Sequence, residues 1–159
     1  FRMVICGSRL IARAVSCTKP HRYITYFVLS RTMASDEVQK AQIASNDEDT
    51  IFGKIISKKI PAKIIYEDDE VLAFHDVSPV SPVHFLVIPK RRIDMLENVK
   101  ESDSPLLGKL LFTASTVARS LHLKEGYRVV INNGKNGAQS VFHLHLHVLG
   151  ERQMLWPPG

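Results

Sequence analysis

Histidine alternates with aliphatic residues in the segment His143-Leu144-His145-Leu146-His147-Val148-Leu149. Side chains of a β-strand point to opposite faces with a period of two residues, so the alternation predicts a strand over 143–149. The three imidazoles are expected on one face, while the intervening aliphatic side chains face a hydrophobic core. Three histidines on one face indicate either a metal site or phosphoryl chemistry.

Composition and charge exclude several classes of protein. The chain has 159 residues, of which 45% are hydrophobic and 23% charged, which is typical of one globular domain. No apolar run approaches the ~20 residues of a membrane-spanning helix. Residues 1–33 carry six basic and no acidic side chains, and the other 15 basic residues face all 16 acidic ones. We therefore expect neither a nucleic-acid nor a membrane partner.

The chain divides into three regions. We expect residues 1–33 to be a basic leader, either a mitochondrial transit segment or upstream translation, and residues 34–50 to be a polar arm, mobile or partly helical. The domain is expected over 51–159. Its predicted helices span 51–58 and 104–121, and its predicted strands span 64–67, 71–77, 84–89, 127–132 and 143–149. This order predicts an α+β fold with an antiparallel sheet.

The spacing of the histidines disfavours a metal site. A strand places His143 and His147 about 13 Å apart, too far for one ion to bind both. Both cysteines, Cys6 and Cys17, lie in the leader, and the sequence shows no nearby carboxylate ligand. We predict no metal, with a catalytic zinc site as the alternative.

Nucleophilic catalysis is the other interpretation. A neutral imidazole attacks phosphorus, and the phosphoramidate that forms is labile enough to be hydrolysed. Such a site needs a group that fixes the tautomer, an acid for the leaving group and donors for the phosphoryl oxygens. The loop over 132–140 is rich in glycine and asparagine and directly precedes the histidines, so its backbone N–H groups can approach an anion.

The histidine segment resembles the signature of the histidine triad (HIT) family, His-φ-His-φ-His-φ-φ with φ hydrophobic. Further segments are similar to the Hint branch of that family: Phe74-His75-Asp76-Val77-Ser78-Pro79, His84-Phe85-Leu86-Val87-Ile88-Pro89-Lys90, Gly137-Ala138-Gln139-Ser140-Val141 and Trp156-Pro157-Pro158-Gly159. The resemblance runs from about Thr50 to the end of the chain. It implies a five-stranded antiparallel sheet with two helices per protomer. It also implies a homodimer with a ten-stranded sheet and the helix over 105–121 at the interface.

The resemblance implies an activity as well. Hint proteins are purine nucleoside phosphoramidate hydrolases, which cleave the P–N bond of adenosine or guanosine 5′-phosphoramidates through a nucleotidyl-histidine intermediate without a cofactor. By the match, His145 is the nucleophile and His147 hydrogen-bonds the phosphoryl group and supports the leaving group. His84 joins their proton relay, and His143 orients rather than attacks.

The same resemblance implies the substrate-binding residues. The phosphate and leaving-group positions are Asn132, Ala138, Gln139 and Ser140. The ribose pair is Asp76 and Val77, and the purine pocket is Ile51, Phe52, Ile55 and Phe74. Trp156 in the tail shapes leaving-group specificity. Simpler roles stay open, because apolar residues of that pocket also fit a core and Asp76 also fits a turn cap. Ala138 stands where many relatives have glycine, which the loop tolerates if φ there is negative.

Two other functions remain as alternatives. One is a dinucleoside polyphosphate hydrolase of the Fhit-like branch, which the Trp156-Pro157-Pro158-Gly159 ending disfavours. The other is a nucleotide-binding scaffold or regulatory protein with incidental catalysis. Hint proteins occur in cytosol and nucleus, and a genuine transit segment would make this one mitochondrial.

Overall fold

The sheet positions every histidine of the site. The computed structural model describes residues 36–46 and 49–158, so the leader lies outside the described residues. The strands are β1 (Ile64–Glu67), β2 (Val71–His75), β3 (Val83–Pro89), β4 (Tyr127–Val130) and β5 (Leu146–Gly150). They form one sheet in the order β1-β2-β3-β5-β4, and all neighbours are antiparallel. The predicted α+β fold with a five-stranded antiparallel sheet is confirmed.

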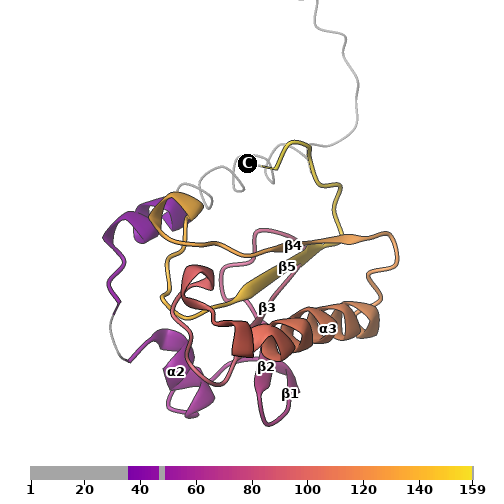
Figure 1. Cartoon of the computed structure of the whole chain (residues 1–159). Coiled ribbons are helices and arrows are strands. Elements are labelled where there is room, and N and C mark those ends of the chain that lie inside the picture. Colours follow the sequence, from indigo (N-terminus) through magenta and orange to yellow (C-terminus); the bar gives the residue numbers. More distant parts are fainter. Residues whose placement is uncertain (1–35, 47–48, 159) are drawn as a thin grey trace, which may run out of the picture.

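Each face of the sheet is covered by a helix. In β2, Val71 and Ala73 belong to one buried cluster, whereas Leu72 and Phe74 belong to the other. This two-residue alternation is the ordinary consequence of the β pleat. Helix α3 (Ser104–Ser120) lies across the first face, and α2 (Ile51–Ile56) packs on the second (Figure 1).

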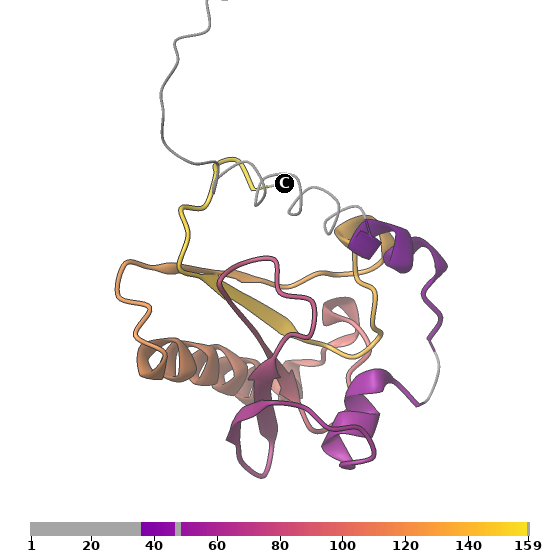
Figure 2. The same cartoon turned by 180° about the vertical axis from the view of Figure 1, so that it is seen from behind.

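Helix α3 buries a stripe at helical spacing against the sheet. Its fully or almost fully buried side chains are Leu110, Thr113, Ala114, Val117 and Ala118, which repeat every three or four residues. The helix begins at Ser104 with Asp103 as its N-cap and ends at Ser120, one residue before the predicted end. Pro105 occupies its first turn, where a missing N–H costs nothing. Figure 2 shows the opposite side of the sheet, with α2 below the 36–43 helix.

Helix α2 holds an aromatic ring against the other face. The Thr50 hydroxyl caps the helix by accepting a hydrogen bond from the Gly53 N–H at 3.1 Å. Phe52 and Ile55 are buried against β2 and β3. The helix ends at Ile56 rather than at Lys58, because Lys58 has a positive φ of 59° that a right-handed helix does not permit.

The histidine segment is only partly a strand. Strand β5 begins at Leu146, so His147 alone of the three histidines lies in it. The antiparallel pairing ends there because Pro89 of β3 has no N–H to donate, and the Leu144 N–H donates instead to the Ile93 carbonyl. The predicted burial of the aliphatic side chains is confirmed, since Leu144, Leu146 and Val148 are at most 1% exposed.

Other predicted boundaries shift by a few residues. Strand β2 ends at His75 and β4 at Val130, two residues before the predicted ends. In the polar arm, residues 36–43 are helical and Ala41 is buried. Both views place this helix beside the short 3-10 helix η3 (Lys135–Gly137) of the glycine-rich loop (Figures 1 and 2). Among the described residues, no helix is both long and apolar enough to cross a membrane.

Candidate active site

The tautomer of His145 is set by the backbone. Its Nδ1 lies 2.7 Å from the carbonyl oxygen of His143, and because a carbonyl only accepts, Nδ1 carries the proton. The neutral ring therefore keeps its lone pair on Nε2. His145 is 3% exposed, and burial lowers its pKa against the opposing effects of its hydrogen bond and of the Glu37 and Asp76 carboxylates. A buried, neutral imidazole with a free Nε2 is a competent nucleophile.

His143 orients this arrangement and is itself held by a hydrogen bond to β3. Its Nε2 lies 2.8 Å from the carbonyl oxygen of Pro89, so Nε2–H donates. The ring is 1% exposed, and burial lowers its pKa. Its buried Nδ1 has no hydrogen-bond partner among residues 36–46 and 49–158. The histidine is thus anchored by its side chain and positions His145 through its backbone.

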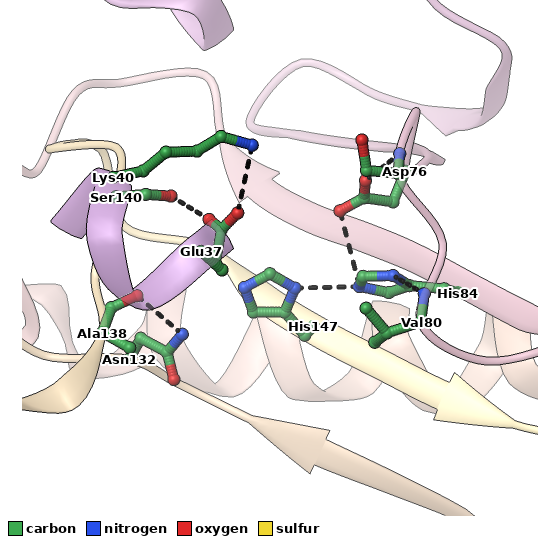
Figure 3. Close-up of polar contacts among 10 residues, drawn as sticks. Glu37, Lys40, Asp76, Val80, His84, Asn132, Ala138, Ser140 and His147 are labelled. Carbon is green, nitrogen blue, oxygen red and sulfur yellow. Dashed lines mark hydrogen bonds and ion pairs between the residues drawn. The ribbon is translucent and has the colours of Figure 1, made fainter. Parts of the chain in front are cut away.

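His84 and His147 form a second, coupled pair (Figure 3). The Val80 N–H donates to His84 Nδ1 at 3.3 Å, and His84 Nε2 lies 2.9 Å from His147 Nδ1. Since His84 Nδ1 accepts, the neutral ring carries its proton on Nε2 and donates it to His147 Nδ1. His147 then presents Nε2–H as a donor. The His145 and His147 ring centroids are 4.9 Å apart, so the donor lies beside the nucleophile.

Burial keeps this pair neutral near pH 7. It lowers the pKa of His147 to about 3, with further lowering from the positive charges that His145 and His84 would carry. Burial also lowers the pKa of His84, while the nearby carboxylates of Asp76 and Glu37 oppose that shift. Perturbed titrations of this kind gather at functional sites.

The two carboxylate oxygens of Asp76 have different partners. Oδ1 accepts a hydrogen bond from the Ser78 N–H at 2.7 Å, which is the turn cap considered in the sequence analysis. Oδ2 lies 3.5 Å from His84 Nε2. The sequence argument that no carboxylate lies near the histidines is therefore wrong, because β2 and β3 bring this one beside them. Ligand atoms of Asp76, His84 and His147 lie within 4.8 Å of one another, a donor set that suits zinc.

Phe52 stands edge-on to two histidines. Its ring centroid is 5.2 Å from that of His145 and 6.0 Å from that of His143, at interplanar angles of 73° and 78°. It also meets Phe74 at 5.7 Å. Phe52, Ile55 and Phe74 all belong to the buried cluster on the α2 face, whereas Ile51 is exposed and does not.

The glycine-rich loop is held by side-chain hydrogen bonds. The buried Gln139 amide donates to the carbonyls of Asp94 and Val141, and its oxygen accepts from the Gly134 N–H. Asn132 donates to the Ala138 carbonyl at 3.2 Å. The Gln139 side chain is thus committed to the protein backbone, and its main-chain N–H donates to the Gly134 carbonyl at 3.1 Å, so Gln139 holds the shape of the loop.

Ala138 corrects a sequence expectation. Its φ is +59°, in the left-handed region, where a negative φ was the condition for tolerating alanine. An L-residue with a Cβ is strained there by about 1–2 kcal/mol. The alanine is held in this conformation because its carbonyl and its N–H are both hydrogen-bonded within the loop.

Two predicted substrate residues project into solvent. Val77 is 93% exposed and Trp156 85%. The tail that carries Trp156 is attached to β4 by a hydrogen bond from Arg128 to the Leu155 carbonyl. Within this chain, neither side chain is packed against the histidines.

Glu37 is the site residue that the sequence analysis did not find. The Ser140 hydroxyl donates a hydrogen bond to its carboxylate, and Lys40 lies 3.8 Å from it (Figure 3). The spacing of Asp36 and Lys40, which pair at 2.9 Å, is a helix signal. No local pattern indicates that this helix lies on a loop about a hundred residues further along the chain.

Comparison with known proteins identifies the family. The family model described as "HIT domain" matches residues 57–154. The chain is 49% identical over 132 residues to "Adenylylsulfatase HINT1" of Arabidopsis thaliana, which covers 82% of this chain and 90% of that protein. It is 56% identical over 113 residues to "14 kDa zinc-binding protein" of Brassica juncea, covering 70% of this chain and all of that one. The chain belongs to the HIT family.

A solved structure and the named relatives narrow the assignment. The crystal structure of a HIT family hydrolase from Legionella pneumophila superimposes with a TM-score of 0.69 and 45% identity, covering 70% of this chain and all of that one. Within the family, the chain falls in the Hint branch. Family and relatives together support a nucleotide hydrolase.

Proposed function

We propose that this protein is a purine nucleoside phosphoramidate hydrolase, which cleaves the P–N bond of adenosine and guanosine 5′-phosphoramidates. The hydrogen bond from His145 Nδ1 to the His143 carbonyl is the observation that carries the proposal. It leaves Nε2 of a buried, neutral ring as the nucleophile. The reaction requires no cofactor and proceeds through a nucleotidyl-histidine intermediate.

The covalent steps follow from that nucleophile. Nε2 of His145 attacks phosphorus, the P–N bond breaks, and its electron pair leaves on the amine nitrogen. Water then attacks phosphorus, the bond to Nε2 breaks, and the nucleoside monophosphate departs. His147 Nε2–H, beside His145, donates a hydrogen bond to the phosphoryl oxygens as charge develops on them.

The leaving amine needs a proton, and the His84–His147 pair is placed to deliver it. The pair takes one proton from solvent and passes it from His147 Nε2 to the amine nitrogen. The attacking water later returns a proton to the pair, so the net reaction is hydrolysis. The Asp76 carboxylate, 3.5 Å from His84 Nε2, stabilises the transient positive charge. Because the His84–His147 pair is weakly basic, it gives up its extra proton readily once it is protonated.

The remaining residues bind the nucleotide. We assign the purine to Phe52, Ile55 and Phe74 with exposed Ile51 at the margin, and the ribose to Asp76 and Val77. The loop residues Asn132, Ala138, Gln139 and Ser140 form the phosphoryl site, in which Gln139 holds the loop in shape, and Ser140 faces the leaving group. Trp156 contributes to leaving-group specificity from the tail.

Adenylyl sulfate is a second candidate substrate. The name of the Arabidopsis relative states adenylylsulfatase activity, and the same attack by His145 would expel sulfate from phosphorus. Sulfate leaves without protonation, so this reaction does not need the acid role of the pair. Both substrates would form one adenylylated histidine.

The test is hydrolysis of an adenosine 5′-phosphoramidate by residues 33–159, with EDTA present and His145→Ala alongside. We expect AMP release by the wild type and none by the variant, which should keep its fold. The adenylylated protein should be detectable by mass spectrometry after rapid quenching.

Three outcomes would favour other interpretations. AMP binding without turnover would favour the nucleotide-binding scaffold. A preference for dinucleoside polyphosphates would favour the Fhit-like activity. Loss of turnover in EDTA, restored by zinc, would mean that Asp76, His84 and His147 bind a metal needed for catalysis, against the prediction of none.

We propose further that the protein is a homodimer built from residues 51–159. Leu111 and Phe112 on the outer side of α3 are 53% and 70% exposed, and Tyr127 and Val129 of the edge strand β4 are also exposed. Such apolar side chains suit a second copy that continues the sheet. Sedimentation should give a dimer, and Phe112→Lys should give monomers. Cytoplasm and nucleus are the expected compartments, and mitochondria if residues 1–33 are a transit segment.

A further inference from the structure

The 36–43 helix carries a negative charge onto the phosphate-binding loop. The Ser140 hydroxyl donates to the Glu37 carboxylate, and Ala41 of the same helix is buried. Figure 3 shows Glu37 between Ser140 and His147. The helix is therefore packed on the site, and its carboxylate lies on the side where the proposed function places the leaving group.

This charge is incompletely neutralised. Lys40 lies 2.9 Å from Asp36 but 3.8 Å from Glu37, so its closer partner is Asp36. The Glu37 side chain is 41% exposed. Its carboxylate acts on His84 and His145, opposing the lowering of their pKa by burial. Glu37 thus contributes a negative field at the reacting groups.

We infer that Glu37 determines leaving-group selectivity, favouring amines, whose nitrogen carries positive charge when it is protonated as the P–N bond breaks, over anionic groups such as sulfate. The inference rests on the proposed function. A carboxylate at the leaving-group side attracts the protonated nitrogen in the transition state and repels a departing sulfate dianion. Glu37 makes this distinction although the nucleophile and the nucleotide are the same for both substrates.

The test compares two substrates across two variants. The value of kcat/KM is measured for an adenosine 5′-phosphoramidate of a primary alkyl amine and for adenylyl sulfate, with wild type, Glu37→Gln and Asp36→Asn. For Glu37→Gln we expect the ratio of amine to sulfate cleavage to fall about fivefold or more, as for a partly exposed charge pair. Asp36→Asn removes a negative charge from the same helix without touching Ser140, but it frees Lys40 to pair with Glu37. The ratio should therefore fall in the same direction as for Glu37→Gln, and by less.

Two further measurements isolate the charge. The shift in ratio should shrink in 1 M salt, where the Debye length is about 3 Å. Inorganic sulfate should also inhibit Glu37→Gln at lower concentration than it inhibits the wild type, a readout that does not depend on the leaving-group step. Glutamine keeps the length of the Glu37 side chain and a hydrogen-bond acceptor for Ser140, so the helix should stay in place. An unchanged Tm of the variant would check this.

The outcomes separate the inference from its premise. If Glu37→Gln changed kcat/KM by the same factor for both substrates, the helix would only limit access to the site, and the selectivity inference would be wrong. An unchanged ratio would also overturn it. If the wild type hydrolyses neither substrate, the proposed function itself fails.

Discussion

At the residue scale, Asp76 has two tasks that an amide replacement separates. Its Oδ1 caps the turn at Ser78, and its Oδ2 faces His84 Nε2. Asparagine keeps an acceptor for the cap but removes the charge that favours a protonated His84–His147 pair.

We expect Asp76→Asn to lower kcat for phosphoramidate cleavage by about tenfold. This is less than the roughly 10²-fold that loss of a general acid itself costs, because Asp76 only stabilises the protonated pair. Cleavage of adenylyl sulfate should fall less, because sulfate needs no proton. Steady-state kinetics with both substrates would check this. A rise in KM with kcat unchanged for both would instead indicate that Asp76 acts only through the ribose.

Ala138 is a strained residue in a loop that is otherwise well bonded. Its φ of +59° disfavours a side chain with a Cβ. We expect Ala138→Gly to raise the free energy of unfolding by about 1 kcal/mol, since relief of strain exceeds the entropy lost by glycine. Urea denaturation would measure it, with Gly134→Ala, where φ is +66°, as a control that should destabilise.

At the scale of elements, the end of β5 and the segment after α3 are packed without spare room. A Cβ added to Gly150 would lie 2.7 Å and 2.9 Å from the two methyl carbons of Leu123. Gly150 pairs with Val83 of β3 and Tyr127 of β4, so its backbone cannot move away without disturbing both ladders.

We expect Gly150→Ala to destabilise the protein by about 1–3 kcal/mol, the usual cost of overpacking. Leu123→Ala should also destabilise, because that side chain is buried. The double variant should lose less unfolding free energy than the sum of the two single variants, since alanine at position 123 leaves room for the methyl group added at position 150. Additive losses in denaturant titrations would show that the clash is not the cause.

At the scale of the whole molecule, the four histidines of the site make stability depend on pH. Burial lowers the pKa of His84, His143, His145 and His147. Below the ordinary histidine pKa of about 6.5, the unfolded chain binds protons that the folded protein refuses. The stability that these neutral histidines contribute is therefore fully present above that pH and is lost as the pH falls toward their lower pKa values in the folded protein.

We expect the Tm at pH 5 to be at least about 5 °C below that at pH 7, because His147 alone should lose about 2 kcal/mol over that range. The contribution of His147 should continue to fall until about pH 3, its pKa in the folded protein. His147→Gln should reduce the pH dependence by removing one titrating group. An unchanged Tm across this range would contradict the neutral, buried site.

Much of the fold follows from local patterns in the sequence. Alternation in 143–149 determined which side chains enter the core, and helical spacing in 104–120 determined the stripe that α3 buries. These patterns are local, because the pleat and the helical turn repeat within a few residues. The histidine signature likewise indicated the family that the comparisons confirm.

Tertiary structure decided the features that depend on contacts across the chain. The pairing of β3 with β5 places His84 against His147 across 63 residues, and the same sheet brings Asp76 to that pair. Glu37 reaches Ser140 across 103 residues, and Ala138 takes a positive φ because its loop is closed by side chains. No local spacing encodes these distances, since they arise only when separate elements pack together.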